Sequence, residues 1–200
     1  MGRDVRTLAD ISSDAIGSAH LSRVTIEMTY RRDCMNHGLN LDGGIHEIPL
    51  PTLTGRLWLC GKHFIGPDPE RVLLGVNADH VVCLVHEREL RNRYDGYISW
   101  LRSTDRATWY PVFDLSSPPL AEILPLYQGV VERLNSGESV VVHCAAGIGR
   151  AGTLAVAVCQ LAGMPLNEAL AHVRKHRPGA GPEVGSQLDA VVALEESLSR

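Results

Sequence analysis

Lysine is almost absent from this chain of 200 residues, because only Lys62 and Lys175 occur among its 19 basic residues. No run of lysine and arginine reaches five residues, and the formal net charge is -4. A protein that binds nucleic acid through its phosphates is normally basic. The charge pattern therefore disfavours a nucleic-acid partner.

Long hydrophobic runs and a disulfide-type cysteine pattern are missing as well. No apolar run approaches the ~18 residues that a membrane-spanning helix needs, and the first residues do not resemble a secretory signal. The five cysteines stand at irregular spacing, which favours a reducing compartment over a disulfide framework. We therefore predict a cytoplasmic protein without a membrane span.

Aromatic residues are scarce, with only two phenylalanines, so we expect the core to consist of valine, leucine, isoleucine and alanine. Hydrophobic residues make up 44% of the chain and charged residues 21%, which are ordinary globular values. The length suits one domain with an extension of about fifty residues. We expect residues 51–200 to form the domain, and residues 1–50 to form an N-terminal extension that packs on it.

The hydrophobic pattern predicts an α/β fold. Apolar and polar residues alternate from Arg23 to Tyr30, as in a half-buried strand, and Asp42-Gly43-Gly44 is a turn signal. Short apolar runs predict strands at 57–60, 81–85 and 139–142, and helical patterns begin at Asp68 and at Ser117 and recur over 151–162, 165–176 and 184–198. We expect a mostly parallel sheet of about five strands, flanked by helices, with a C-terminal helical cluster.

The most informative segment joins one of these strands to a helix. The strand ends at His143, a loop of small residues follows, and an apolar helix starts near Arg150. A loop at the carboxyl end of a strand and the amino end of a helix is suited to anions, because its N–H groups converge on them. Gly147 and Gly149 allow the tight backbone that such a cradle needs. We expect the amides from Ala145, Ala146, Gly147, Ile148, Gly149 and Arg150 to bind phosphate oxygens.

Cys144 and Arg150 supply the reactive groups of this loop. The helix dipole, the N–H groups and the arginine all favour the thiolate form of Cys144, which is the nucleophilic form. The guanidinium of Arg150 can hold two oxygens of a tetrahedral anion.

The segment resembles the C-x5-R signature loop of the cysteine-dependent phosphatases, with His143 before the cysteine and Gly-x-Gly-Arg-x-Gly-Thr around the arginine. The resemblance implies an aspartate about thirty residues upstream that acts as general acid. Asp114 occupies that place in a loop before a helix, as in dual-specificity phosphatases, and Asp105 is the fallback.

The similarity extends to about residues 55–195. Residues 81–90 followed by Tyr94, and Gly179-Ala180-Gly181 running into Gln187, are similar to the kinase-associated dual-specificity phosphatases. If the family mechanism holds, Cys144 attacks phosphorus, Asp114 transfers the protons, and no metal or other cofactor takes part. The resemblance also implies that His143 orients the loop, that Gln187 supports the site, and that Cys83 can form a disulfide with Cys144.

The sequence departs from the family pattern at two positions. Ala151 follows the arginine where the family usually has serine or threonine, whose hydroxyl stabilises the leaving thiolate, and Glu183 replaces a water-positioning glutamine. A weakly active or inactive phosphate-binding pseudophosphatase therefore stays an alternative.

The substrate class rests on the variable positions of the loop, Ala145, Ala146 and Ile148. Their neutral side chains suit a phosphorylated residue of a protein better than a polyanionic inositol. A phosphoprotein is the predicted substrate, and a lipid or small phosphoester is the alternative. Arg88, Arg91 and Arg93 either contact acidic residues of a substrate or form a solvated helix face.

Overall fold

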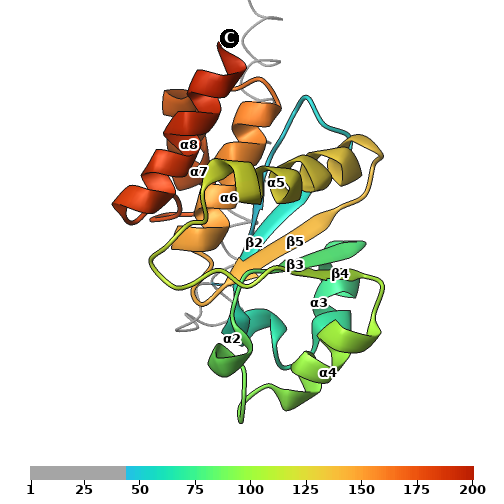
Figure 1. Cartoon of the computed structure of the whole chain (residues 1–200). Helices are drawn as coiled ribbons and strands as arrows, with labels where there is room; N and C mark the ends of the chain where they lie inside the picture. The colour runs from blue at the N-terminus through green and yellow to red at the C-terminus, as the bar shows by residue number, and fades with distance from the viewer. Residues whose placement is uncertain (1–43) are drawn as a thin grey trace, which may run out of the picture. The chain divides into compact units, whose positions relative to one another are not determined.

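The computed structural model describes residues 44–200, which contain a five-stranded sheet in the order β1-β2-β5-β3-β4 (Figure 1). The first strand pairs antiparallel with the second, and the remaining neighbours are parallel. This arrangement confirms the predicted mostly parallel sheet. The strands are β1 (Ile45–Ile48), β2 (Leu57–Gly61), β3 (His80–Cys83), β4 (Ala107–Trp109) and β5 (Val140–Cys144).

Helices cover both faces of the sheet, and Figure 1 shows α5 to α8 gathered on one face and α2 to α4 on the other. The three C-terminal helices confirm the predicted helical cluster. The helices are α2 (Lys62–Ile65), α3 (Pro69–Val76), α4 (Asp95–Ser103), α5 (Leu120–Asn135), α6 (Gly149–Leu161), α7 (Leu166–His176) and α8 (Gly185–Leu198), and a 3-10 turn covers Glu87–Glu89.

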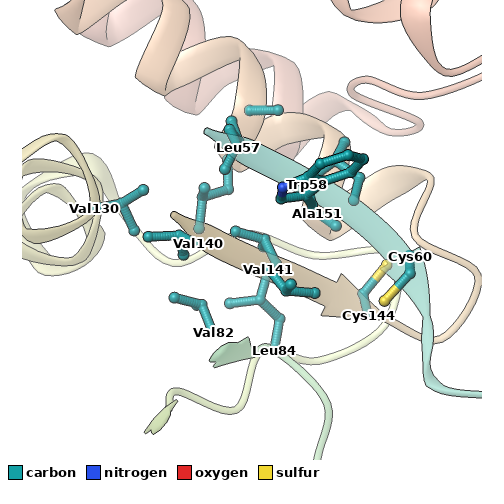
Figure 2. Packing of buried hydrophobic residues seen from close by; sticks show 14 of the residues in the cluster. Leu57, Trp58, Cys60, Val82, Leu84, Val130, Val140, Val141, Cys144 and Ala151 are labelled. Atoms are coloured by element: carbon teal, nitrogen blue, oxygen red, sulfur yellow. The ribbon is translucent and has the colours of Figure 1, made fainter. Parts of the chain in front are cut away.

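The core lies around β5 and α6. Every residue of β5 is buried, as expected for a central strand covered on both faces, and nearly the whole of α6 is buried as well. Figure 2 shows the valines of β5 between Leu57 of β2, Val82 of β3 and Val130 of α5. The catalytic loop predicted from the sequence joins these two buried elements, so packing on both sides holds its ends.

Local signals in the sequence explain where the helices begin. Asp68 caps α3, because its carboxylate accepts a hydrogen bond of 3.0 Å from the N–H of Arg71, and a proline occupies the first helical position. The helix α5 begins at Leu120 rather than at Ser117. Pro118 and Pro119 explain the delay, because a residue before a proline is held in an extended conformation.

The helix α4 and the strand β4, which follow β3 in the chain, were not predicted. The strand β4 has only three residues, all partly exposed, so it shows no alternating pattern. The helix α4 buries Tyr97, Ile98 and Leu101 on one face, whereas Gly96 and Ser99 are exposed. This helical spacing was present in the sequence and was missed.

The predicted strand from Arg23 to Tyr30 and most of the turn at 42–44 lie outside the described residues. The strand β1 falls within the stretch assigned to the extension and is part of the sheet. The division at residue 50 and the packing of the extension stay predictions. Within residues 44–200, no helix has the length and apolar character needed to cross a membrane.

Candidate active site

The loop after β5 lies at the edge of the sheet where three parallel strands end. His143 is in register with Cys60 of β2 and with Cys83 of β3, so the carboxyl ends of all three strands meet beside Cys144. Gly147 has a φ of +73°. A Cβ atom there would come within 2.3 Å of the carbonyl oxygen of Cys60, so only glycine fits this turn of the loop.

Cys144 is the last residue of β5, and its side chain is 3% exposed. The N–H of Gly147 donates to its Sγ at 3.2 Å. The loop thus curls around the thiol that was predicted to be the nucleophile.

Arg150 is buried beside this thiol and is held by Glu89, from the 3-10 turn after β3. Its Nη1 and Nη2 each donate to one carboxylate oxygen of Glu89 at 2.9 Å, and Nη1 also donates to the carbonyl oxygen of Val112 at 2.8 Å. The Nε of Arg150 is buried and has no hydrogen-bond partner among the described residues. This N–H is a donor available to an anion.

The charges of this pair depend on each other. Burial disfavours the charge of Glu89, but hydrogen bonds from Arg150 and from the N–H of His86 outweigh it and lower the pKa of the carboxyl. For Arg150, burial opposes the charge, while Glu89, Cys144 and Asp114 favour it and raise its pKa. The site therefore keeps a fixed positive charge in a buried position.

Asp114 reaches the same arginine from the loop between β4 and α5. Its Oδ1 lies 3.1 Å from Nη2 of Arg150, and its side chain is 64% exposed. Asp105, the fallback, precedes β4 and therefore lies at the amino-terminal edge of a strand parallel to β3, opposite the edge that carries Cys144. The structure brings Asp114 and not Asp105 to the predicted site.

Gln187, at the start of α8, links two loops around the site. Its Oε1 accepts the N–H of Glu183 at 2.8 Å, and its Nε2 donates to the carbonyl oxygen of Ser116 at 3.3 Å. Ser116 is two residues from Asp114, so this fully buried amide supports the loop that carries the predicted acid. The carboxylate of Glu183 lies against Gly149, because a Cβ atom built there would be 1.9 Å from Oε2 of Glu183.

His143 lies beneath the loop and is fully buried. Its Nε2 is 2.7 Å from the hydroxyl of Tyr97, and its Nδ1 is 3.4 Å from the carbonyl oxygen of Cys144. Burial lowers the pKa of His143 to about 4, so the ring is neutral at pH 7. Such a ring can hold the backbone in place, and the orienting role expected for His143 stays a prediction.

The sequence reasoning missed Glu89 and Tyr97 as partners of the site. Glu89 lay within the segment similar to the kinase-associated phosphatases, and its position after a strand beside β5 was the available signal. Tyr97 comes from α4, which was itself not predicted. Of the three candidate arginines, Arg91 pairs with Glu87 at 2.9 Å, and Arg88 lies over the ring of Phe113 at 5.3 Å.

Two buried cysteines, Cys83 and Cys60, are candidates for a disulfide with Cys144, and Cys83 is the one predicted from the sequence. Cys83 on β3 is buried, and burial raises its pKa to about 12. Burial likewise raises the pKa of Cys60 to about 12, and the nearby Cys144 adds to this effect. Figure 2 shows Cys60 and Cys144 beside each other at the ends of β2 and β5. The four cysteines of the described residues are free thiols, and the role of Cys83 stays a prediction.

The sequence matches a known protein family. The family described as "Dual specificity phosphatase, catalytic domain" matches residues 73–190, which is more than half of the chain. The chain belongs to the dual-specificity phosphatase family. The match spans the loop with Asp114, the loop with Cys144 and Arg150, and the start of α8.

The curated relatives of this dual-specificity phosphatase align with part of its sequence. The dual specificity protein phosphatase Mpk3 of Drosophila melanogaster is 30% identical over 139 residues, which are 68% of this chain and 32% of that protein. The protein tyrosine phosphatase PRL-1 of Trypanosoma cruzi is 36% identical over 72 residues, 34% of this chain and 41% of that protein. The chain thus covers less than half the length of these relatives.

Solved structures agree on the fold. Tk-PTP in its active form is 29% identical and has a TM-score of 0.57, with 74% of this chain and 99% of that chain covered. Kinase associated phosphatase is 16% identical with a TM-score of 0.65, covering 78% of this chain and 95% of that chain. PTPMT1 in complex with PI(5)P is 21% identical with a TM-score of 0.62, covering 78% and 96%.

The departure from the family pattern at Ala151 has a structural consequence. Ala151 is fully buried in the first turn of α6 and has no hydroxyl to offer Cys144. The nearest hydroxyl along the helix belongs to Thr153, but it donates to the carbonyl oxygen of Gly149 at 2.8 Å. This hydroxyl is therefore engaged within the helix of the dual-specificity phosphatase.

Proposed function

We propose that this dual-specificity phosphatase hydrolyses phosphotyrosine, phosphoserine or phosphothreonine in proteins through a phosphocysteine intermediate. The observation that carries the proposal is the convergence of three side chains from separate segments. Asp114 lies 3.1 Å from Arg150, and Arg150 is buried in the same loop as Cys144, whose Sγ accepts the N–H of Gly147. A nucleophile, an acid and an anion-binding cation are the groups that this chemistry requires.

In the first step, the thiolate of Cys144 attacks phosphorus in line with the bond to the leaving oxygen. The S–P bond forms as the P–O bond breaks, and protonated Asp114 gives its proton to the departing oxygen. Arg150 and the amides from Ala145 to Arg150 hold the phosphoryl oxygens, with the free N–H of Arg150 Nε as one donor. Glu89 keeps the guanidinium in place through both carboxylate oxygens.

In the second step, water attacks phosphorus and the S–P bond breaks. Asp114, now a carboxylate, takes a proton from the water, and Cys144 leaves as a thiolate. Phosphate is released and the enzyme returns to its initial state. Every proton that Asp114 gives in the first step is thus regained in the second.

The surroundings of the site support a protein substrate. The variable loop residues Ala145, Ala146 and Ile148 bring no positive charge, and the carboxylate of Glu183 lies against the loop at Gly149. Extra phosphates of an inositol ring would meet this negative charge without lysines to balance it. Exposed Phe113 and Leu115, on either side of Asp114, offer apolar contacts to a peptide.

A second candidate, a phosphate-binding protein with weak turnover, rests on Ala151 and Thr153. The leaving thiolate of the second step lacks a hydroxyl at Ala151, and that of Thr153 is engaged with Gly149. A hydrogen bond to a charged group contributes about 1.5–3 kcal/mol, so breakdown of the intermediate would be about ten- to a hundredfold slower. A lipid or small phosphoester remains the third candidate, since the fold is shared with PTPMT1.

Stopped-flow hydrolysis of p-nitrophenyl phosphate by the wild type and by Cys144→Ser tests the enzyme activity. We expect steady turnover by the wild type and none by the variant. Phosphotyrosine, phosphothreonine and phosphoserine peptides are then compared with PI(5)P at equal concentration. A clear preference for PI(5)P would contradict the protein substrate, and vanadate binding without turnover would support the pseudophosphatase.

A further inference from the structure

Arg177, the residue directly after α7, is buried beside the catalytic loop with only 1% of its surface exposed. A buried guanidinium is costly unless each of its donors finds an acceptor. Two donors of Arg177 go to the loop itself: Nη2 donates to the carbonyl oxygen of Ala146 at 2.8 Å, and Nε donates to that of Gly147 at 2.6 Å. Arg177 therefore holds the backbone of the catalytic loop by two successive carbonyl groups.

Further contacts of Arg177 connect the catalytic loop to the first two strands of the sheet. Its Nη1 lies 3.2 Å from the carbonyl oxygens of Leu59 and Gly44, and 3.1 Å from Nδ1 of His46. Because arginine only donates, Nδ1 of His46 must accept, so this ring is neutral. Burial and the charge of Arg177 both lower the pKa of His46, which favours the neutral ring that this hydrogen bond requires.

The two gripped carbonyls belong to peptide units that face the thiol. The carbonyl of Ala146 and the N–H of Gly147 are parts of one planar trans peptide, so they point in opposite directions. Arg177 holds the carbonyl end, and the N–H end donates to Sγ of Cys144 at 3.2 Å. The carbonyl of Gly147 and the N–H of Ile148 form the next such unit, so the same grip turns the Ile148 N–H inward.

We infer that Arg177 is a positioning residue, which holds two successive peptide units of the loop so that their N–H groups face the Cys144 thiolate and the bound phosphoryl group. The inference rests on the proposed function only in taking Cys144 as the nucleophile. No sequence pattern pointed to this residue. It acts through the backbone of Ala146 and Gly147.

A merely structural role is the competing explanation, because Arg177 also joins α7 to β1 and β2. The two roles differ in what they do to the thiol. A structural arginine changes stability, whereas a positioning arginine changes how readily Cys144 ionises and binds an anion. The other charged or titratable groups around this thiol are Arg150 with its partners Glu89 and Asp114, Glu183 beside Gly149, Cys60 and the neutral His143, and none of these residues is substituted in the variants below.

Alkylation of Cys144 by iodoacetate, followed across pH by peptide mapping, is the test, and it works even if the protein turns over no substrate. Arg177→Met removes the hydrogen bonds to both loop carbonyls. Arg177→Lys keeps the positive charge but cannot span two carbonyls. Lys175→Met is the matched control, because it removes an exposed charge from α7. Thermal melting shows which variants fold. Arg177→Ala with added guanidinium, at a non-denaturing concentration, is measured if the methionine variant does not fold.

We expect the alkylation of Cys144 at pH 6 to slow by about tenfold in Arg177→Met and by less in Arg177→Lys, since charge-assisted hydrogen bonds are involved. Vanadate affinity should fall in parallel, Lys175→Met should match the wild type, and guanidinium should restore alkylation in Arg177→Ala. A folded Arg177 variant with the wild-type alkylation profile and vanadate affinity would overturn the inference. An alkylation rate of Arg177→Ala that equals the wild-type rate, both with and without guanidinium, would overturn the inference as well.

Discussion

Glu89 holds the guanidinium of Arg150 through two hydrogen bonds of 2.9 Å, one to each carboxylate oxygen. The arginine side chain is 1% exposed and the glutamate side chain 17% exposed, so the pair is largely shielded from water. This bidentate contact fixes the plane of the guanidinium before any anion binds. Preorganisation of this kind lowers the cost of binding a phosphoryl group in the transition state.

Replacing Glu89 with glutamine should therefore reduce both stability and activity. Removing one partner of a buried ion pair costs about 3–5 kcal/mol, and the partial exposure of Glu89 places the expected loss of unfolding free energy at about 2 kcal/mol. Urea denaturation measures it, and kcat/KM for p-nitrophenyl phosphate should fall by at least about tenfold. Glu87→Gln is the control, because Glu87 makes only surface ion pairs with Arg91 and Arg102 and should lose less than about 1 kcal/mol. Equal losses in both variants would contradict the role of Glu89.

The same pair predicts how stability depends on pH. The folded pKa of Glu89 lies below its usual value of 4.5, so the unfolded state binds the proton more tightly. The stabilisation is complete above the unfolded pKa and is lost as the pH falls through the lower, folded pKa. The difference in unfolding free energy between wild type and Glu89→Gln should therefore be constant from pH 6 to 7 and shrink below about pH 4.5. Urea titrations at several pH values measure it, and a difference that grows toward low pH would reverse the assigned sign.

Restoring a hydroxyl at Ala151 should speed the breakdown of the phosphocysteine intermediate. Ala151→Ser adds one hydroxyl in the first turn of α6, and a hydrogen bond from it to the leaving thiolate should raise the rate of the second step by about tenfold or more. Stopped-flow kinetics would show a burst in the wild type that is reduced in the variant. Thr153→Val is the control, because this hydroxyl already donates to Gly149 and should leave the burst unchanged. An identical burst in wild type and Ala151→Ser would mean that Ala151 does not limit turnover.

Mild oxidation by peroxide should link Cys144 to Cys83. The thiolate of Cys144 attacks peroxide and becomes a sulfenic acid with loss of hydroxide, and the thiol of Cys83 then condenses with it, releasing water. Non-reducing peptide mapping identifies the linked peptides, with Cys83→Ser and Cys60→Ser compared directly. A disulfide between Cys144 and Cys60 instead would assign the redox role to Cys60, which lies on β2 at the same edge of the sheet. The absence of both bridges would end the redox hypothesis.

Replacing Gly147 with alanine should disrupt the catalytic loop. The glycine has a φ of +73°, and an added Cβ atom would lie 2.3 Å from the carbonyl oxygen of Cys60 and 2.8 Å from Nη2 of Arg177. Relief of these contacts must move the peptide that donates to Cys144. We expect vanadate binding to fall by about tenfold or more, measured by titration. Gly163→Ala is the control, because it also has a positive φ but meets no atom within 4 Å, so vanadate should bind it as in the wild type.

Short-range patterns in the sequence determined much of the fold and the centre of the site. Apolar runs marked the strands at 57–60, 81–85 and 139–142, and helical spacing marked the C-terminal helices, because burial on two faces or one leaves a direct trace in the residue order. Cys144 and Arg150 were predictable together because one tight loop holds both. Asp114 was found only through the resemblance to a family, since a lone aspartate in a loop has no pattern of its own.

The partners that hold these groups were decided by the tertiary structure. Glu89, Tyr97 and Arg177 come from three separate segments and meet at the loop because parallel strands end at one edge and α7 returns behind it. In the sequence they are an acid, an aromatic residue and a helix-terminal arginine like many others. Their importance comes from burial, which makes a polar group depend on the partners that the fold brings to it. The sequence alone thus determined which residues could react, and only the folded chain decided what positions them.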